Sequence, residues 1–68
     1  MKATRKQALM LDALIEHGNN KLIGRALNIE ERSVAMALLR LKQLHNANSN
    51  VTLAIRWERF KREQQTNG

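Results

Sequence analysis

The segment from Asn20 to Val34 constrains the fold of this chain more than any other part of the sequence. Apolar residues recur in it on both sides of a short polar stretch. Their spacing places them on the inner side of two short helices that meet at a tight turn. Four of them are the expected buried anchors: Ile23, Leu27, Ile29 and Val34.

Two residues near the middle of this segment suit a close turn between helices. Gly24 has no side chain, so it fits where two helices approach too closely for a larger residue. Asn28 tolerates the left-handed backbone conformation that a tight turn requires. Two short helices joined in this way form a helix-turn-helix.

The rest of the chain also predicts helices. Its 68 residues include no proline and only three glycines. Apolar residues recur at spacings of three and four, which indicates helices rather than strands. A chain of this length forms one small domain. It buries only about 60% of the surface of its unfolded chain, which is too little for a second core. We predict an all-α, four-helix helix-turn-helix domain over residues 1–68, with helices at about 4–17, 20–27, 30–45 and 51–63 and a polar tail at 64–68.

Local signals mark the expected helix ends. Thr4 and Gln7 have the spacing of a capping box, and Gly18 supplies a C-terminal stop. Asn19 or Asn20 caps the second helix. The polar stretch 46–50 is rich in residues that form turns and caps, so it separates the third helix from the fourth.

Apolar residues of three helices define the expected core. In the first helix they are Ala8, Leu11, Leu14 and Ile15. In the third helix they are Val34, Ala37, Leu38, Leu41 and Leu44. In the fourth helix they are Leu53, Trp57 and Phe60. A small domain needs its largest apolar residues inside, so we expect the tryptophan and the phenylalanine to close the core.

Basic residues outnumber acidic ones. Twelve Lys and Arg against six Asp and Glu give the chain a formal net charge of +6. So much positive charge on so small a domain favours a polyanionic partner, and nucleic acid is the first candidate. The alternative interpretation is that the charge serves only solubility.

The composition argues against catalysis and metal binding. The chain has no cysteine, and His17 and His45 lack the spacing of a zinc pair. We interpret both histidines as helix-end or surface groups. We expect no enzyme, no metal and no cofactor. No apolar run approaches the ~20 residues of a membrane span, so we expect a cytoplasmic protein without a membrane partner.

The segment from His17 to Val34 resembles the DNA-binding domain of the LuxR/GerE/NarL type. The residues that match the pattern of this family are Asn20, Lys21, Ile23, Leu27, Ile29, Glu31 and Val34. The resemblance implies a helix-turn-helix that binds double-stranded DNA and regulates transcription. It also implies a polar break and a fourth helix used for packing or dimerisation, which leaves a homodimer open.

The chain departs from this family in the helix that would meet DNA. Gly24 stands where the family usually has Ala, and Ser33 where it has Thr. Residues 35–39 read Ala-Met-Ala-Leu-Leu, where the family places Lys, Asn, His or Arg. This helix offers few hydrogen-bond donors to bases, so we expect little sequence specificity.

The start of the second motif helix enters the major groove in helix-turn-helix complexes. Helical spacing predicts outward side chains at Glu31, Arg32, Ala35, Met36 and Leu39. Arg32 is the expected base reader, because arginine binds guanine through two hydrogen bonds. Basic residues and the amides at the start of the second helix are expected to bind phosphates. The full set of candidate DNA contacts is Asn20, Lys21, Arg25, Arg32, Ser33, Met36, Arg40 and Lys42.

The outward Met36 and Leu39 also support a second interpretation. Adjacent apolar side chains on an exposed helix face commonly mark a protein-binding surface. With Arg56 and Arg59 of the fourth helix, they are candidate contacts for RNA polymerase or another transcription protein. Two alternatives stay open: the helical phase differs and Met36 and Leu39 are core, or the protein coats DNA without sequence preference.

Overall fold

The computed structural model describes residues 1–66, which contain four α-helices. They are α1 (Arg5–His17), α2 (Asn20–Leu27), α3 (Glu31–Leu44) and α4 (Asn50–Thr66). No strand occurs within residues 1–66. The expected all-α class with four helices is therefore confirmed.

Helix α4 is longer than the sequence pattern predicted. It continues to Thr66, so the expected polar tail at 64–68 is wrong for residues 64–66, and residues 67 and 68 lie outside the described part of the chain. The reason is local, because Glu and Gln at positions 63–65 are good helix formers.

The expected caps form at the ends of the helices. Thr4 Oγ1 accepts a hydrogen bond from the amide of Gln7 at 3.1 Å, and Gln7 Oε1 accepts one from the amide of Thr4 at 3.0 Å. Gly18 ends α1 with a φ of 69°. Asn19, rather than Asn20, caps α2. At the start of α4, Ser49 Oγ accepts a hydrogen bond from the amide of Thr52 at 3.1 Å.

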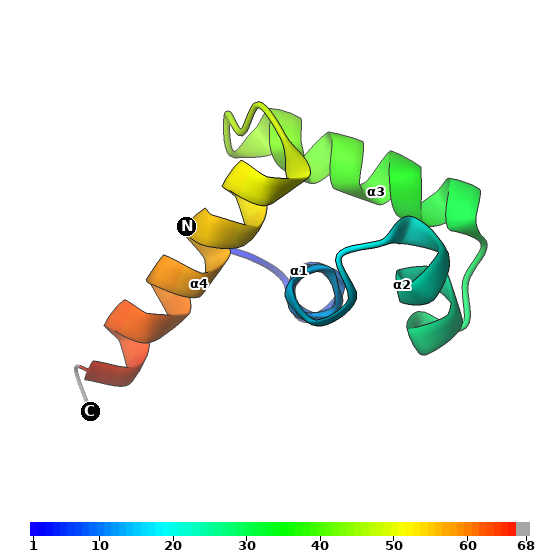
Figure 1. Ribbon diagram of the computed structural model, residues 1–68. Helices are drawn as coiled ribbons and strands as arrows, with labels where there is room; N and C mark the ends of the chain where they lie inside the picture. The colour runs from blue at the N-terminus through cyan, green and yellow to red at the C-terminus, as the bar shows by residue number, and fades with distance from the viewer. Residues whose placement is uncertain (67–68) are drawn as a thin grey trace.

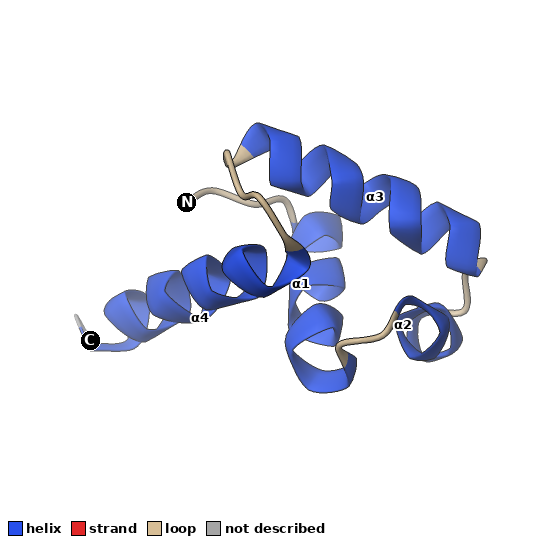
Figure 2. Ribbon diagram, turned by 45° about the horizontal axis from the view of Figure 1, so that its top comes forward, coloured by secondary structure: helices blue, strands red, loops and turns tan. Residues whose placement is uncertain are grey.

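Helix α1 lies at the centre of the molecule. It contacts each of the other three helices, and Figure 1 shows it end-on between α4 and α2, with α3 across the top. Helix α3 contacts both α2 and α4, whereas α2 and α4 do not contact each other within the described residues. In Figure 2, α2 lies against the start of α3, and the loop to α4 leaves from the end of α3.

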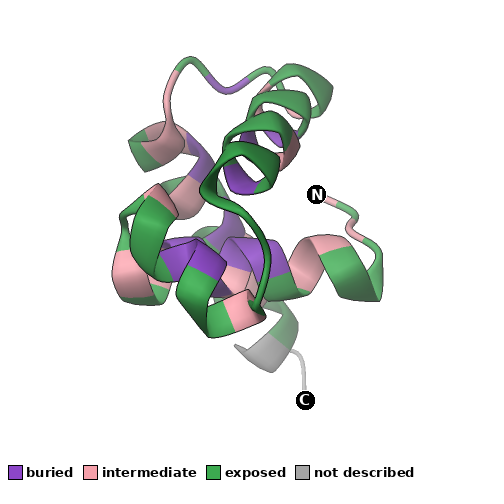
Figure 3. Ribbon diagram, turned by 90° about the vertical axis from the view of Figure 1, so that its right-hand side faces the viewer, coloured by how far each residue is buried: buried purple, intermediate pink, exposed green. Residues whose placement is uncertain are grey.

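The core lies where these helices face one another. Figure 3 shows the buried segments on the inner sides of the helices. The most deeply buried side chains come from all four helices and are Leu11, Ile23, Val34, Leu38 and Leu53. Trp57 is also buried, and its ring stacks on the half-buried ring of Phe60 with the centroids 5.5 Å apart. The expected role of both aromatic residues in closing the core is confirmed.

Two expected core residues are exposed instead. Leu44 is 64% exposed and Ile29 is 41% exposed. At 100° per residue, Leu44 lies nearly a quarter turn from the centre of the buried stripe of α3. The backbone of Ile29, rather than its side chain, packs against Gly24, so its side chain is left in an open hollow beside α2.

Helix α1 buries a slightly different face from the one expected. Leu11 and Leu14 are buried as predicted, whereas Ala8 and Ile15 are only half-buried. Two residues that the pattern did not single out, Met10 and Ala13, are buried as well. The inner face is wider than one stripe because α1 contacts three helices.

Asp12 of α1 holds α4 in place through two hydrogen bonds. Its Oδ1 atom accepts one from Trp57 Nε1 and one from Lys61 Nζ, each at 2.8 Å. Burial raises the pKa of the Asp12 carboxyl, but the hydrogen bonds from Lys61 and Trp57 and the charge of Lys61 outweigh it. The pKa of Asp12 therefore lies below its ordinary value of 3.8.

Candidate nucleic-acid interface

The turn between α2 and α3 has the close geometry that the sequence predicts. Asn28 ends α2 in the left-handed conformation, with φ 57° and ψ 47°. The amide of Ile29 donates a hydrogen bond to the carbonyl of Gly24 at 2.9 Å. A Cβ atom on Gly24 would lie 2.7 Å from the carbonyl oxygen of Ile29. The predicted roles of Gly24 and Asn28 are confirmed, and together they hold the start of α3 against α2.

The outer face of α3 carries a ridge of exposed side chains, and the two in its middle are apolar. We use the name α3 ridge for Arg32, Met36, Leu39 and Gln43, which are three or four positions apart and are all exposed. Met36 is 50% exposed and Leu39 is 45% exposed. The alternative that these two residues belong to the core is therefore wrong. Glu31 and Ala35 are exposed as well, as predicted.

Two basic residues flank the α3 ridge from opposite sides. Arg40 and Lys42 are two positions apart, which is about 200° around a helix. Arg40 is exposed, and it lines a hollow of about 350 Å³ together with Arg32 and Ser33. Lys42 is half-buried and lines a different hollow, which also contains Leu39. The ridge therefore has one cation on each flank.

Lys6 joins this surface from another part of the chain. It lies in the first turn of α1 and lines a hollow of about 350 Å³ between α1 and α3 that also contains Arg40. No acidic residue lines this hollow or the one that Arg40 shares with Arg32. We call Lys6, Arg40 and Arg32 the basic strip. No local sequence signal marks Lys6, because only the packing of α1 against α3 brings it there.

The basic residues of α2 have a different electrostatic environment from those of the basic strip. Lys21 and Arg25 line a hollow of about 480 Å³ that also contains Glu30 and Glu31. The positive and negative charges of this hollow balance in number. Its electrostatic attraction for a phosphate is therefore weaker than that of the basic strip.

The amides at the start of α2 are partly occupied already. Asn19 Oδ1 accepts hydrogen bonds from the amides of Lys21 and Leu22 at 2.8 and 3.3 Å. The expectation that both of these amides bind phosphate is therefore wrong, because the capping side chain already satisfies them. Asn20, the next candidate, is half-buried at the first position of α2.

The candidate protein-binding residues do not share one hollow. Met36 and Leu39 belong to the α3 ridge, whereas Arg56 and Arg59 of α4 line a hollow with Met1 and His45. The expected grouping of these four residues on one surface is therefore wrong, because the structure places the two pairs apart.

Within residues 1–66, no three His, Asp or Glu side chains come together as a metal site requires. Nor does any helix in this range combine the length and the apolar character needed to cross a bilayer. Comparison with models of protein families, with curated proteins and with solved structures finds no match for this chain.

Proposed function

We propose that this protein is a small transcription regulator that binds double-stranded DNA with the α3 ridge in the major groove. The observation that carries the proposal is the placement of Arg40 and Lys42 on opposite flanks of the ridge. The major groove is about 12 Å wide, and the phosphates of the two strands border it on both sides. A helix inserted there therefore binds best with a cation on each flank.

The basic strip strengthens the side of the ridge that faces α1. Lys6 and Arg40 line one hollow without an acidic neighbour in its lining, so both are available to phosphates. With Lys42 on the other flank, we infer three phosphate contacts. Each contact releases counterions from the DNA. A plot of the logarithm of the binding constant against the logarithm of the salt concentration therefore has a slope of about −3.

The α3 ridge also limits how much sequence the protein reads. Arg32 is its main donor for base edges, through two hydrogen bonds to guanine. Met36 contributes apolar contact only, for example to a thymine methyl group. We infer that phosphate contacts dominate the affinity and that sequence preference rests mainly on Arg32.

The experiment that tests this proposal measures binding to a labelled duplex of about 20 base pairs by fluorescence anisotropy over a salt series. We expect saturable binding at about 0.05 M salt and the salt slope given above. Selection from a pool of random duplexes then measures sequence preference. Absence of binding at the lowest salt concentration would contradict the proposal.

A second candidate function rests on the exposure of Met36 and Leu39. An exposed apolar pair between basic flanks suits an acidic, partly apolar protein surface. The alternative proposal is that the α3 ridge binds RNA polymerase or another transcription protein instead of an operator. Binding to purified RNA polymerase tests this alternative. If it is right, Met36→Ala weakens polymerase binding at least about fivefold, because apolar burial is lost. DNA affinity changes by less than twofold.

A further inference from the structure

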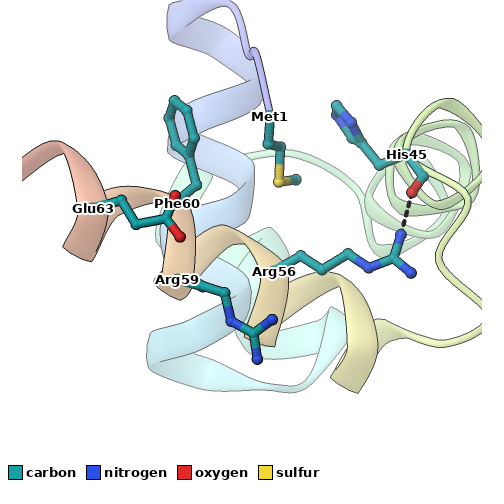
Figure 4. A pocket seen from close by; sticks show the side chains of 6 residues that line it. All are labelled: Met1, His45, Arg56, Arg59, Phe60 and Glu63. Atoms are coloured by element: carbon teal, nitrogen blue, oxygen red, sulfur yellow. Dashed lines mark hydrogen bonds between the residues drawn. The ribbon is translucent and has the colours of Figure 1, made fainter.

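A separate hollow lies where the start of the chain, the end of α3 and helix α4 meet. It has a volume of about 320 Å³, and its lining residues are Met1, His45, Arg56, Arg59, Phe60 and Glu63 (Figure 4). None of them belongs to the α3 ridge or to the basic strip. The hollow therefore has no part in the DNA interface proposed above.

One side of the hollow is apolar. The half-buried ring of Phe60 lies there, backed by the buried ring of Trp57 at a centroid distance of 5.5 Å. Because Trp57 is fixed in turn by its hydrogen bond to Asp12, Phe60 has a rigid support. The side chain of Met1 lies between Phe60 and Arg56 (Figure 4). This side suits an aromatic or aliphatic group.

The other side carries cations. Arg56 donates a hydrogen bond from its guanidinium to the carbonyl of His45, which links α4 to the end of α3 (Figure 4). Arg59 is exposed one turn further along α4. Glu63 is the acidic residue of the lining, so arginines outnumber carboxylates by two to one. The hollow therefore attracts an anion.

The imidazole of His45 adds an unsatisfied polar atom. Its Nε2 atom is buried and has no hydrogen-bond partner. Buried polar atoms in folded proteins are almost always paired, but this nitrogen is closed to solvent, so it contacts a ligand atom only after the ring rotates. The ring is turned toward the side on which Met1 lies (Figure 4).

We propose that this hollow binds a small organic anion in which an aromatic or apolar group accompanies a phosphate or carboxylate. The apolar group packs on Phe60 and Met1, and the anionic group pairs with Arg59 and Arg56. The volume lies at the lower end of the range of about 300–1,000 Å³ for ligand pockets, which suits a ligand about the size of a nucleoside monophosphate.

The fluorescence of Trp57 reports occupancy directly, because Trp57 is the only tryptophan and stacks on Phe60. The probes are adenosine 5′-monophosphate, adenosine and inorganic phosphate, each titrated separately. We expect a saturable change with the monophosphate and at least about tenfold weaker binding of either fragment, because each lacks one of the two interactions. No change with the monophosphate, or equal binding of inorganic phosphate, would overturn the proposal.

Two matched variants locate the site. Arg59→Gln is expected to weaken binding of the monophosphate about tenfold, because a charge-assisted hydrogen bond is lost. Arg25→Gln removes the same charge from α2, which makes no contact with α4 within the described residues, and is expected to leave binding of the monophosphate unchanged. If Arg59→Gln has no effect, the assignment is wrong. If duplex DNA changes the fluorescence and the monophosphate does not, the hollow is a nucleic-acid contact and this proposal fails.

Discussion

The indole N–H of Trp57 donates a hydrogen bond to the carboxylate of Asp12, a residue 45 positions earlier in the chain, at 2.8 Å. The same carboxylate oxygen pairs with Lys61. These two contacts fix the rotation of α4 against α1, so that Leu53 and Trp57 face the core. A long-range polar contact thus supports the burial of one face of α4, and the buried side chains of Leu53 and Trp57 supply the larger share of its packing.

Removing this carboxylate is expected to loosen α4. Asp12→Ala leaves the indole N–H of Trp57 without its partner, which costs about 1–2 kcal/mol of unfolding free energy. Urea denaturation followed by Trp57 fluorescence measures the loss. Glu16→Ala is the control, because Glu16 is an exposed acid on the same helix, and it is expected to change stability by less than about 0.5 kcal/mol. Equal effects of the two substitutions would contradict the role given to Asp12.

The same pair predicts a dependence of stability on pH. The pKa of Asp12 is lower in the folded protein than its ordinary value of 3.8. Between these two pKa values the unfolded chain therefore binds more protons than the folded protein. The contribution of Asp12 is therefore complete above pH 3.8 and is lost as the pH falls through the folded pKa. Since Asp12 and Lys61 are both partly exposed, the contribution is below about 1 kcal/mol. Asp12→Asn is expected to remove this loss of stability at low pH. The midpoints of urea denaturation between pH 7 and pH 3, compared for wild type and variant, measure it.

Gly24→Ala tests the close contact at the turn. Alanine has the higher helix propensity by about 1 kcal/mol, but its Cβ would meet the backbone of Ile29 at 2.7 Å. Because that neighbour is backbone and cannot rotate away, we expect a net loss of about 1–3 kcal/mol. Thermal unfolding measures it. A stabilised variant would contradict the close contact between Gly24 and Ile29.

Several local features of the fold were predictable because they depend only on neighbours in the chain. The capping box of Thr4 and Gln7, the left-handed Asn28 and the glycine stop at Gly18 are examples. Each follows from the backbone requirements of a helix end. The exposure of Met36 and Leu39 followed from helical phase alone.

Other features required the packed molecule. Leu44 belongs to the same apolar pattern as Leu41, but α3 leaves it on the outside of the bundle. Lys6 reaches Arg40 only because α1 packs against α3. The hollow that contains His45 and Arg59 joins segments that are distant in sequence. Spacing along one helix carries no information about such neighbours.

The basic strip predicts unequal effects of basic residues on DNA affinity. Lys6→Ala and Arg40→Ala each remove a phosphate contact, so each is expected to weaken binding to all sequences alike and to reduce the salt slope by about 1. Arg25→Ala is the matched control, because Arg25 shares its hollow with Glu30 and Glu31, and its effect is expected to be smaller. The anisotropy series described above measures all three variants. A larger effect of Arg25→Ala would contradict the placement on α3 and indicate that DNA binds at α2.

Arg32→Ala separates base reading from phosphate binding. It is expected to relax sequence preference, at a cost of about 1–3 kcal/mol at the preferred site, and to leave affinity for random duplexes nearly unchanged. Selection from random duplexes with the wild type and the variant measures the difference. A uniform loss on all sequences would instead assign Arg32 to a phosphate.

An amide chemical-shift map of the protein with and without a short duplex locates the DNA interface residue by residue. We expect the largest shifts along α3, at Arg32, Met36, Leu39 and Arg40, with a second group in the first turn of α1 around Lys6. Shifts confined to α4, or no shifts at low salt, would contradict the placement of the DNA interface on α3.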